Sequence, residues 1–436
     1  MKQALIITYY WPPSGGSGVQ RWLKFVKYLP QFGWKPIVYT PENPSFGIKD
    51  ESLLKDVSGQ TEVIRSPIWE PYDLFMWFSN LLGKKKRMQD GVLSTGGKSL
   101  FQKLSTWIRG NFFIPDPRIF WVNPSVKFLS HYLETNPVDV VISTGPPHSC
   151  HLIALRISEK FNLPWLADFR DPWTTMDYYK DLKLTAWADR KHHALEHKIL
   201  TGADAVSVIG NIMKKEFEEK RKREVIAIPN GYDPQDFELA TEIPLDKDFS
   251  LVFAGSFFPR QNPDALWQAI FELKEEQHPG VQFLKIKLIG RVDPVILDSI
   301  HAHHLDEYLA VETYQPHTEI VKRLRSARVL LLPINNFEGA RWMLTGKLFE
   351  YLAAQRPILC IGPTDGEAAK ILDETKAGEA FDFSDVKGVK EFLSRMYAQY
   401  ENGSPGTSSS ETGSYSRQEL TGRLAAELDT LYLARR

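Results

Sequence analysis

A stretch late in the chain combines the residue types that bind a phosphate and a sugar hydroxyl. Residues 344–354 have the sequence LTGKLFEYLAA, in which Leu348, Tyr351 and Leu352 recur at helical spacing. The free backbone N–H groups in the first turn of a helix bind anions. Glu350 lies about one turn inside this helix, on the side opposite Leu348 and Leu352. The stretch therefore predicts a diphosphate at the helix start and a carboxylate that binds hydroxyl groups beside it.

The residues that follow indicate what positions this helix. Pro357 ends it, and residues 358–361 form a short, continuous apolar run. Parallel sheets bury runs of this kind. The sequence thus predicts a helix that leads directly into a buried parallel strand.

Size and composition narrow the class of protein. With 436 residues the chain exceeds what one core usually supports, so we expect two domains. A net charge of −1 gives no reason to invoke nucleic acid. The two cysteines, Cys150 and Cys360, cannot form a disulfide framework. The first residues are expected to form a strand rather than a signal peptide, and no apolar run approaches the roughly 20 residues of a membrane helix. We therefore expect a cytoplasmic protein.

The N-terminal part opens as a doubly wound sheet does. A strand at residues 3–10 leads through a glycine-rich loop with Gly15 and Gly16 to a helix at 19–28 and a second strand at 36–40. Ligands of such sheets bind beyond the carboxyl ends of the strands. The loop lacks the Gly-x-Gly-x-x-Gly pattern of nicotinamide enzymes. Its glycines either approach a ligand closely or only allow a tight turn.

Polar residues follow two further strands of this half. His148 comes after one strand, and Asp168, Arg170 and Asp171 stand at the end of the next. These positions fall on the crevice side, where the architecture keeps its chemistry. The alternative is an ion-pair cluster of Asp168, Arg170 and Asp171 without chemistry.

An insertion at residues 69–122 interrupts the alternation of strands and helices. Its aromatic residues stand near the cationic run Lys84–Arg87. Aromatic side chains beside a cationic cluster are typical of an interfacial membrane contact. The alternative is an insertion that packs its aromatics inward and leaves its lysines solvated.

The histidines do not predict a metal site. His193 and His197 are one helical turn apart, but the Glu that zincins place directly after the first His is missing. His148 and His151 lack further ligands at suitable spacing. We expect no metal.

A second series of strands and helices begins at Ser250, after a mostly polar segment at 234–249 that we interpret as a linker. Its first strand leads into a loop with Arg260 and Asn262, and a later strand ends at Gly290-Arg291. Two such domains leave a cleft between them, where small ligands usually bind.

Taken together, these elements resemble the retaining glycosyltransferases of family 4, whose fold of two Rossmann-like domains facing a cleft is called GT-B. The likeness covers nearly the whole chain. The matching pieces are Gly15-Gly16, Ala203-Asp204, Ile228-Pro229-Asn230-Gly231-Tyr232-Asp233, Gly255 and Lys347-Leu348-Phe349-Glu350-Tyr351-Leu352-Ala353. The most specific are the piece that begins at Ile228 and the piece that begins at Lys347.

The resemblance implies an α/β protein that transfers a sugar from a UDP- or GDP-linked donor to an acceptor hydroxyl, with retention of configuration and without metal or cofactor. The acceptor would be a surface glycan or a lipid-linked precursor. The implied domains are an acceptor-side domain at 1–240 and a donor-binding domain at 241–400. Composition and helical spacing add a flexible low-complexity segment at 401–416 and a helix at 417–436 that is able to pack back on the first domain.

The resemblance also assigns roles to residues. Glu350 matches the second Glu of the family's Glu-x7-Glu motif and would hold the nucleotide ribose, while backbone N–H groups of Leu344, Thr345 and Gly346 would hold the diphosphate. The expected residues are Asp171, Arg260, Lys347 and Glu350 for catalysis; Gly15, Gly16, Arg260, Asn262, Gly290, Arg291, Leu344, Thr345, Gly346 and Glu350 for the donor; and His148, Asp168 and Asp171 on the acceptor side.

The sequence departs from the family pattern at one motif position. The first Glu of Glu-x7-Glu is Trp342 here, and Glu338 is out of register. In the family that Glu contacts hydroxyls of the donor sugar. A nucleotide-sugar-binding protein without catalysis and a nucleotide-sugar epimerase therefore remain alternatives to the transferase, because fold does not separate them.

Overall fold

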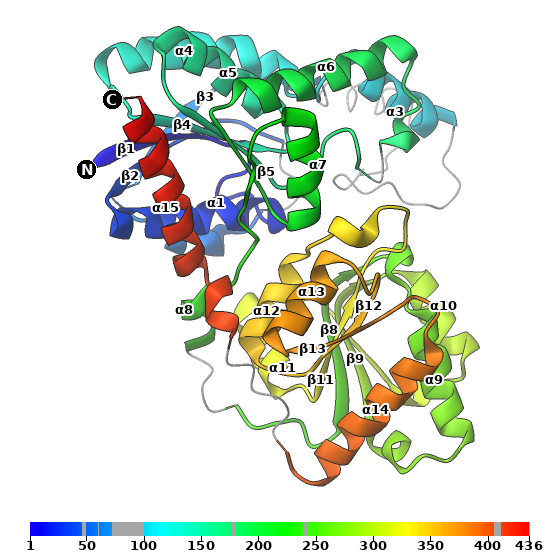
Figure 1. Ribbon diagram of the computed structural model, residues 1–436. Coiled ribbons are helices and arrows are strands. Elements are labelled where there is room, and N and C mark those ends of the chain that lie inside the picture. The colour runs from blue at the N-terminus through cyan, green and yellow to red at the C-terminus, as the bar shows by residue number, and fades with distance from the viewer. Residues whose placement is uncertain are drawn as a thin grey trace. The chain divides into compact units, whose positions relative to one another are not determined.

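The computed structural model describes residues 1–45, 49–59, 61–71, 100–176, 179–238, 243–404 and 411–435. The chain forms two compact units (Figure 1). Unit 1 comprises Met1–Pro229 and Gln418–Arg436, and unit 2 comprises Asn230–Arg417.

Unit 1 is built on a sheet of parallel strands in the order β3-β2-β1-β4-β5-β6-β7. Strand order reverses between β1 and β4, so the carboxyl ends of these two strands form the switch point where doubly wound sheets bind ligands. The strands are β1 (Lys2–Ile7), β2 (Trp34–Pro41), β3 (Glu62–Ser66), β4 (Val140–Gly145), β5 (Trp165–Phe169), β6 (Ala205–Val208) and β7 (Ile226–Ala227).

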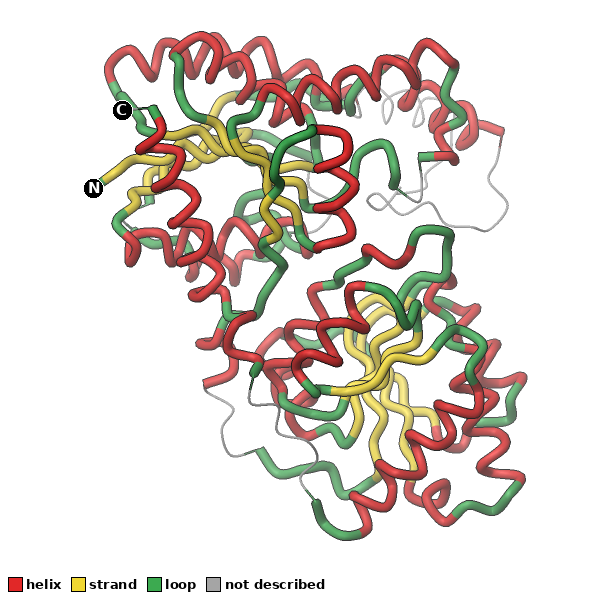
Figure 2. The backbone as a smooth tube through the Cα atoms, viewed as in Figure 1, coloured by secondary structure: helices red, strands yellow, loops and turns green. Residues whose placement is uncertain are grey.

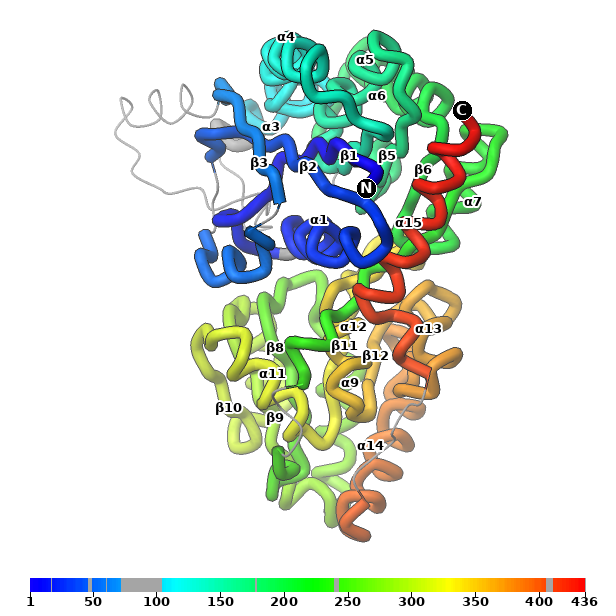
Figure 3. Tube along the Cα trace, turned by 90° about the vertical axis from the view of Figure 1, so that its left-hand side faces the viewer, coloured from blue at the N-terminus to red at the C-terminus, as the bar shows by residue number. Residues whose placement is uncertain are grey.

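Helices cover both faces of this sheet (Figures 1 and 2). In the side view of Figure 3, α4, α5 and α6 lie over one face and α1 lies under the other. The helices of unit 1 are α1 (Ser17–Tyr28), α3 (Leu100–Phe112), α4 (Ile119–Thr135), α5 (Ser149–Phe161), α6 (Ala186–Gly202), α7 (Asn211–Arg221) and α15 (Arg417–Ala434), with short 3₁₀ helices at Leu29–Phe32, Glu51–Asp56 and Lys180–Leu182.

The last helix, α15, belongs to the core of unit 1. Leu420, Leu424 and Leu428 are fully or almost fully buried, in one apolar cluster with side chains of α1 and β1. Asp429 accepts a hydrogen bond from Trp34 Nε1 at 2.8 Å. The last helix of the chain thus packs into the apolar core of unit 1.

Unit 2 repeats the architecture with the order β10-β9-β8-β11-β12-β13, again with parallel pairing. Its switch point lies between β8 and β11. The strands are β8 (Phe249–Phe257), β9 (Leu284–Val292), β10 (Leu309–Glu312), β11 (Val329–Pro333), β12 (Ile358–Ile361) and β13 (Gly378–Phe381).

The helices of unit 2 also lie on both faces of its sheet (Figure 2). Side chains of α9, α10 and α14 share one buried apolar cluster with β8 and β9. The helices are α8 (Pro234–Glu238), α9 (Asp264–Glu275), α10 (Pro294–Ala302), α11 (His317–Ser326), α12 (Gly346–Ala354), α13 (Glu367–Thr375) and α14 (Val386–Glu401), with 3₁₀ helices at Pro259–Gln261, Pro279–Phe283, Asp306–Tyr308, Ala340–Trp342 and Thr412–Tyr415.

The segment expected to be a linker starts with structure of its own. The division between the units falls at Pro229, before the expected boundary at 240, and α8 occupies residues 234–238. Tyr232 N donates to Tyr415 O at 3.2 Å, and Arg417 N donates to Tyr232 O at 2.7 Å. These bonds attach the segment after Pro229 to the stretch that leads into α15, which is why it belongs to unit 2.

Two predicted segments fall partly outside the described residues. Lys84–Arg87 and the aromatics at 75–78 of the insertion lie there, as do residues 405–410 of the low-complexity segment. The described end of the insertion forms α3 and the start of α4.

Candidate functional site

The carboxyl edge of the unit 2 sheet is packed as closely as glycine allows. Gly255 in β8 and Gly290 in β9 are register partners, with φ of 118° and 117°. A Cβ on Gly290 would lie 2.5 Å from the Gly255 carbonyl oxygen, and a Cβ on Gly255 would lie 2.8 Å from Lys347 Cε. Side chains at either position would therefore separate the strand ends from each other or from Lys347.

Lys347 extends from the first turn of α12 towards these glycines. Its Nζ lies 5.2 Å from the centroid of the Phe253 ring. Within the described residues its ammonium group makes no hydrogen bond. Burial lowers the pKa of Lys347, and the nearby Glu350 carboxylate acts in the opposite direction. A half-buried cation without an acceptor, at the start of a helix, suits an anionic ligand.

The residues that lead into α12 add unsatisfied donors. Thr345 is the N-cap residue, but its side chain makes no capping bond. Thr345 Oγ1 and Trp342 Nε1 are both buried without a hydrogen-bond partner in the described part of the chain. Leaving buried donors unpaired costs about 1–3 kcal/mol each. A ligand with acceptor oxygens at the start of α12 would satisfy them.

Glu350 lies one turn into α12 among charged groups from three other helices. Burial raises its pKa, His317 and Lys347 lower it, Asp236 raises it and Arg417 lowers it. His317 Nε2 and Asp236 Oδ2 are 3.6 Å apart. Within the described residues, the Glu350 oxygens accept no hydrogen bond, so this partly exposed carboxylate can accept bonds from ligand hydroxyls.

The other donor-side residues have different surroundings. Asn262 is engaged within its own loop, because its Nδ2 donates to Asp264 at 2.7 Å and its Oδ1 accepts from Trp267 Nε1 at 2.9 Å. Arg260 is half-buried in a 3₁₀ turn, and its carbonyl accepts from Asn336 N at 2.7 Å. Arg291 is exposed near the end of β9. Leu344 is buried and Gly346 is exposed at the start of α12.

In unit 1, an arginine ties the glycine-rich loop to the end of β4. Gly15 and Gly16 directly precede α1, and Gly16 is its N-cap with φ of 85°. Arg170 donates to the carbonyls of Gly18 and Pro146, and its Nε donates to Gly145 O at 3.3 Å. Arg170 thus donates hydrogen bonds to backbone carbonyls near the switch point of the sheet, and it is not the cation that pairs with Asp168.

Asp168 is the buried electrostatic centre of unit 1. Its oxygens accept from Arg21 Nη2 at 2.8 Å, Trp22 Nε1 at 2.7 Å, Ser207 Oγ at 2.8 Å and Thr144 Oγ1 at 3.0 Å. Burial raises its pKa, but Arg21 and the hydrogen bonds outweigh burial and hold the pKa below its usual value. The carboxylate has 0% exposure and so presents no surface to an acceptor.

His148 and Asp171 lie closer to the surface at the same edge. His148 is the N-cap residue of α5 and stacks on Trp173, with ring centroids 4.3 Å apart. Burial, with His151 and Arg170 nearby, lowers the pKa of His148 well below its usual range. Asp171 follows β5 and is half-buried. Of the three expected acceptor-side residues, Asp168 is the one with 0% exposure.

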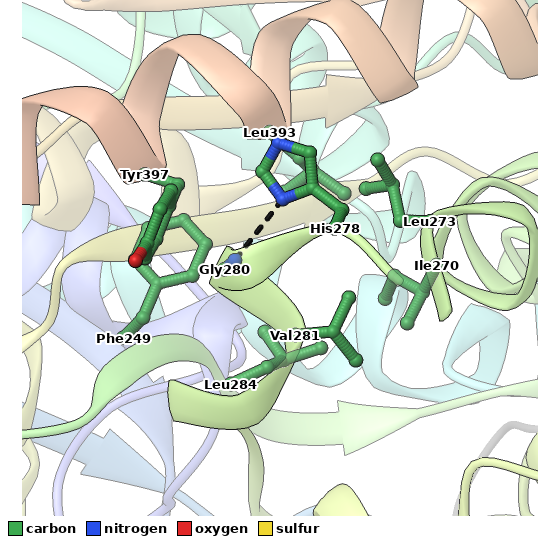
Figure 4. A pocket seen from close by; sticks show the side chains of 9 residues that line it. All are labelled: Phe249, Ile270, Leu273, His278, Gly280, Val281, Leu284, Leu393 and Tyr397. Atoms are coloured by element: carbon green, nitrogen blue, oxygen red, sulfur yellow. Dashed lines mark hydrogen bonds between the residues drawn. The ribbon is translucent and has the colours of Figure 1, made fainter. Parts of the chain in front are cut away.

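The apolar pocket of Figure 4 lies elsewhere. Phe249, Leu284, Leu393 and Tyr397 are among its lining residues, and His278 accepts from Gly280 N at 3.1 Å. Phe249 begins β8, whereas Gly255 stands near its other end. This pocket is a packing gap at the amino edge of the sheet, far from the polar residues described above.

Among the described residues, no three His, Cys, Asp or Glu side chains gather in a way that would hold a metal ion. No helix in the described ranges combines the length and apolar character needed to cross a bilayer.

Several residues around these sites were not expected from the sequence. Asp236, His317 and Arg417 surround Glu350 but are far from it in the chain, and Arg21 pairs with Asp168 across 147 positions. No local sequence pattern predicts partners that are so far apart in the chain. The sequence analysis named Trp342 and Thr345, but only the structure shows that their side-chain donors are buried without a partner among the described residues.

Comparison with known proteins identifies the fold. No family model and no curated protein matches the chain. Among solved structures, a sucrose-phosphate synthase from Thermosynechococcus elongatus superimposes with a TM-score of 0.61 at 14% identity over 100% of both chains. A UDP-forming α,α-trehalose-phosphate synthase from Burkholderia vietnamiensis gives 0.63 at 11% identity over 100% of this chain and 98% of that one. The Anabaena protein HepE, solved with UDP-glucose, gives 0.53 at 10% identity over 100% and 98%.

These similarities confirm the predicted fold class. Both units are α/β with parallel sheets, as in GT-B glycosyltransferases. At such low identity the structural similarity establishes the fold and does not identify the substrate.

Proposed function

We propose that this chain is a glycosyltransferase that moves a sugar from a nucleotide-sugar donor to an acceptor hydroxyl. The observation that carries the proposal is the pair Lys347 and Glu350 on α12. One offers a cation and the other a carboxylate, neither is hydrogen-bonded within the described residues, and both lie at the edge where this fold binds ligands.

The chemistry fits this pair. Breaking a sugar–phosphate bond leaves a nucleoside diphosphate with additional negative charge. Lys347 and the N-terminus of α12 would stabilise that charge as it develops. Thr345 Oγ1 and Trp342 Nε1 supply further donors for phosphate or sugar oxygens. Glu350 accepts hydrogen bonds from the ribose hydroxyls.

The remaining roles follow the resemblance. Arg260 contributes positive charge beside the diphosphate, and Gly290-Arg291 borders the nucleobase. On unit 1, Gly15 and Gly16 approach the donor, whereas His148 and Asp171 face the acceptor. We propose retention of configuration, a UDP- or GDP-linked donor, a glycan or lipid-linked acceptor, and no requirement for metal or cofactor.

A donor screen tests this proposal. Thermal-shift measurements with UDP- and GDP-sugars identify the donor, because a ligand that binds only the folded state raises Tm according to its affinity. Mass spectrometry of reactions with glycan acceptors then detects the transferred sugar. Stabilisation by one nucleotide series together with a product of one added sugar is expected. No stabilisation and no product with any donor would overturn the proposal.

Trp342 favours a second candidate, a nucleotide-sugar-binding protein without catalysis. An indole N–H donates where the family's glutamate accepts, so one contact to the donor sugar is reversed. This candidate predicts nucleotide binding with no turnover. Turnover that disappears in Glu350→Gln would exclude it.

We also propose a peripheral contact of unit 1 with an anionic membrane. Trp69, Leu104 and Phe112 are 55%, 54% and 67% exposed in the described ends of the insertion. Anionic lipid headgroups attract cationic runs, and the same insertion carries the run Lys84–Arg87, which lies outside the described residues. Flotation with anionic liposomes should carry the protein upward and should fail for Phe112→Ser. Tyr314→Ser, at a 79% exposed position of unit 2, is the matched control. Equal flotation of both variants would contradict the contact.

A further inference from the structure

A line of buried hydrogen bonds in unit 1 runs from the sheet to α5. Trp165 Nε1 in β5 lies 2.8 Å from Ser143 Oγ in β4, and Ser143 Oγ lies 2.8 Å from His151 Nδ1. All three side chains have 0% exposure. None of them belongs to the donor-side or acceptor-side residues discussed above.

The direction of these bonds follows from the donor inventory. An indole N–H only donates, so Ser143 Oγ accepts from Trp165. Within the described residues, the Ser143 hydroxyl hydrogen has no acceptor other than His151 Nδ1. If His151 donated instead, a buried hydroxyl hydrogen would be left unpaired, at a cost of about 1–3 kcal/mol. His151 Nδ1 therefore accepts, and the neutral ring carries its proton on Nε2.

This Nε2 lies near a nitrogen of a second histidine, His148. A Cβ on Gly145 would lie 2.5 Å from His151 Nε2 and 2.9 Å from His148 Nδ1, so both nitrogens lie close to the same point beside Gly145. Both are buried and have no hydrogen-bond partner in the described part of the chain. A buried N–H on His151 favours a lone pair, rather than a second N–H, on the neighbouring His148 nitrogen.

We propose that Ser143 and His151 are positioning residues that hold the proton of neutral His148 on Nε2. Of the two His148 nitrogens, Nδ1 is the one that is buried without a hydrogen-bond partner in the described part of the chain. The ring itself is held in place by stacking on Trp173. His148 then presents a hydrogen-bond donor at the carboxyl edge of β4.

The charges around the pair agree with two neutral rings. Arg170, His151 and His192 face His148, and Arg170 and Asp168 face His151. Burial lowers the pKa of His151 to about 3, with Asp168 raising it and Arg170 lowering it. A neutral Nε2–H donates to an oxygen of a bound sugar and does not accept its proton. This consequence rests on the proposed function, whereas the tautomer does not.

Imidazole nitrogen NMR on the full chain tests the assignment without substrate. The protein is labelled with ¹⁵N-histidine, and the His148 signals are identified as those missing from His148→Asn. In the wild type, Nδ1 should resonate as an unprotonated nitrogen and Nε2 as a protonated one. A proton on His148 Nδ1 would overturn the proposal.

Three variants test the relay itself. Ser143→Ala and His151→Leu remove the donors and should shift His148 towards a mixture of tautomers. His151→Gln keeps an amide donor and should restore the wild-type pattern. His192 is the internal control, because Trp173 Nε1 and the Gly110 carbonyl fix its ring independently.

An unchanged His148 tautomer in both Ser143→Ala and His151→Leu would contradict the relay. Ser143→Ala is the smallest change and keeps the test informative if His151→Leu does not fold. Failure of the proposed function appears separately, as absent turnover in a protein whose His148 tautomer is as stated.

Discussion

At the scale of single residues, Lys347 and Glu350 differ from the other charged side chains of the two switch points. Asp168 and Arg170 are used within the protein, by four side-chain partners in one case and by backbone carbonyls in the other. Lys347 and Glu350 are not hydrogen-bonded within the described residues. A charged group kept half-buried without a hydrogen bond costs stability, so we interpret this pair as reserved for a ligand.

Replacing Lys347 should weaken nucleotide binding without weakening the fold. A hydrogen bond to a charged group contributes about 1.5–3 kcal/mol, so Lys347→Ala should raise the Kd for UDP or GDP roughly 10- to 100-fold. Calorimetric titration measures the change, and Lys370→Ala, at an exposed position of α13, is the control. Equal affinity of the two variants would remove Lys347 from the site.

Replacing Glu350 should give a pH-dependent gain in stability. Because its pKa is raised in the folded protein, its charged form is destabilising there at neutral pH. Glu350→Gln should therefore have a higher Tm than the wild type at neutral pH. The gain should shrink as pH falls through the raised pKa and vanish below the ordinary range of a glutamate. Thermal melts across this interval measure it, and a constant difference would contradict the assignment.

The Asp168–Arg21 pair should behave as a buried structural pair. Removing one partner of such a pair costs about 3–5 kcal/mol, so Arg21→Met should lower the urea midpoint of unit 1 strongly. Lys35 and Glu62 form an exposed pair at 3.4 Å, and Lys35→Met should cost less than about 1 kcal/mol. Similar losses in the two variants would argue against this role for Asp168.

These residues also show what sequence alone can predict about a site. Helical spacing placed Lys347 and Glu350 on one helix start, which the structure has. The ion-pair alternative for Asp168 was right in kind, but its cationic partner is Arg21 rather than Arg170. That partner is fixed by packing between α1 and β5, which no local pattern encodes.

At the scale of elements, α15 packs against parts of unit 1 that are far from it along the chain. Its leucines recur at helical spacing, which predicts the helix, but the surface that they cover belongs to strands and helices several hundred positions earlier. The start of unit 2 is a comparable case. Polar composition suggested a linker at 234–249, whereas pairing of Tyr232 with the stretch before α15 orders its first residues.

The packing of α15 gives an element-scale prediction. Leu424 is 1% exposed and Leu433 is 67% exposed on the same helix. Leu424→Ala should destabilise unit 1 by about 2–5 kcal/mol because it leaves a cavity in the core. Leu433→Ala should stay within about 0.5 kcal/mol of the wild type. Chemical denaturation measures both, and a neutral Leu424→Ala would show that α15 is not part of the core.

At the scale of the whole molecule, strand and helix periodicity was enough to predict two doubly wound units, and the solved structures with this fold confirm the class. The substrate was not predictable in the same way. It depends on a few side chains such as Trp342, whose donor replaces an expected acceptor, and on long-range partners such as His317 and Asp236.

The most direct test of the central claim is the release of nucleoside diphosphate from the nucleotide sugar that stabilises the protein. We predict release by the wild type in the presence of acceptor, with and without a metal chelator. Glu350→Gln should lose it, whereas Glu275→Gln, at an exposed position on α9, should retain it. No release by the wild type from any nucleotide sugar, or equal release by the two variants, would contradict the account.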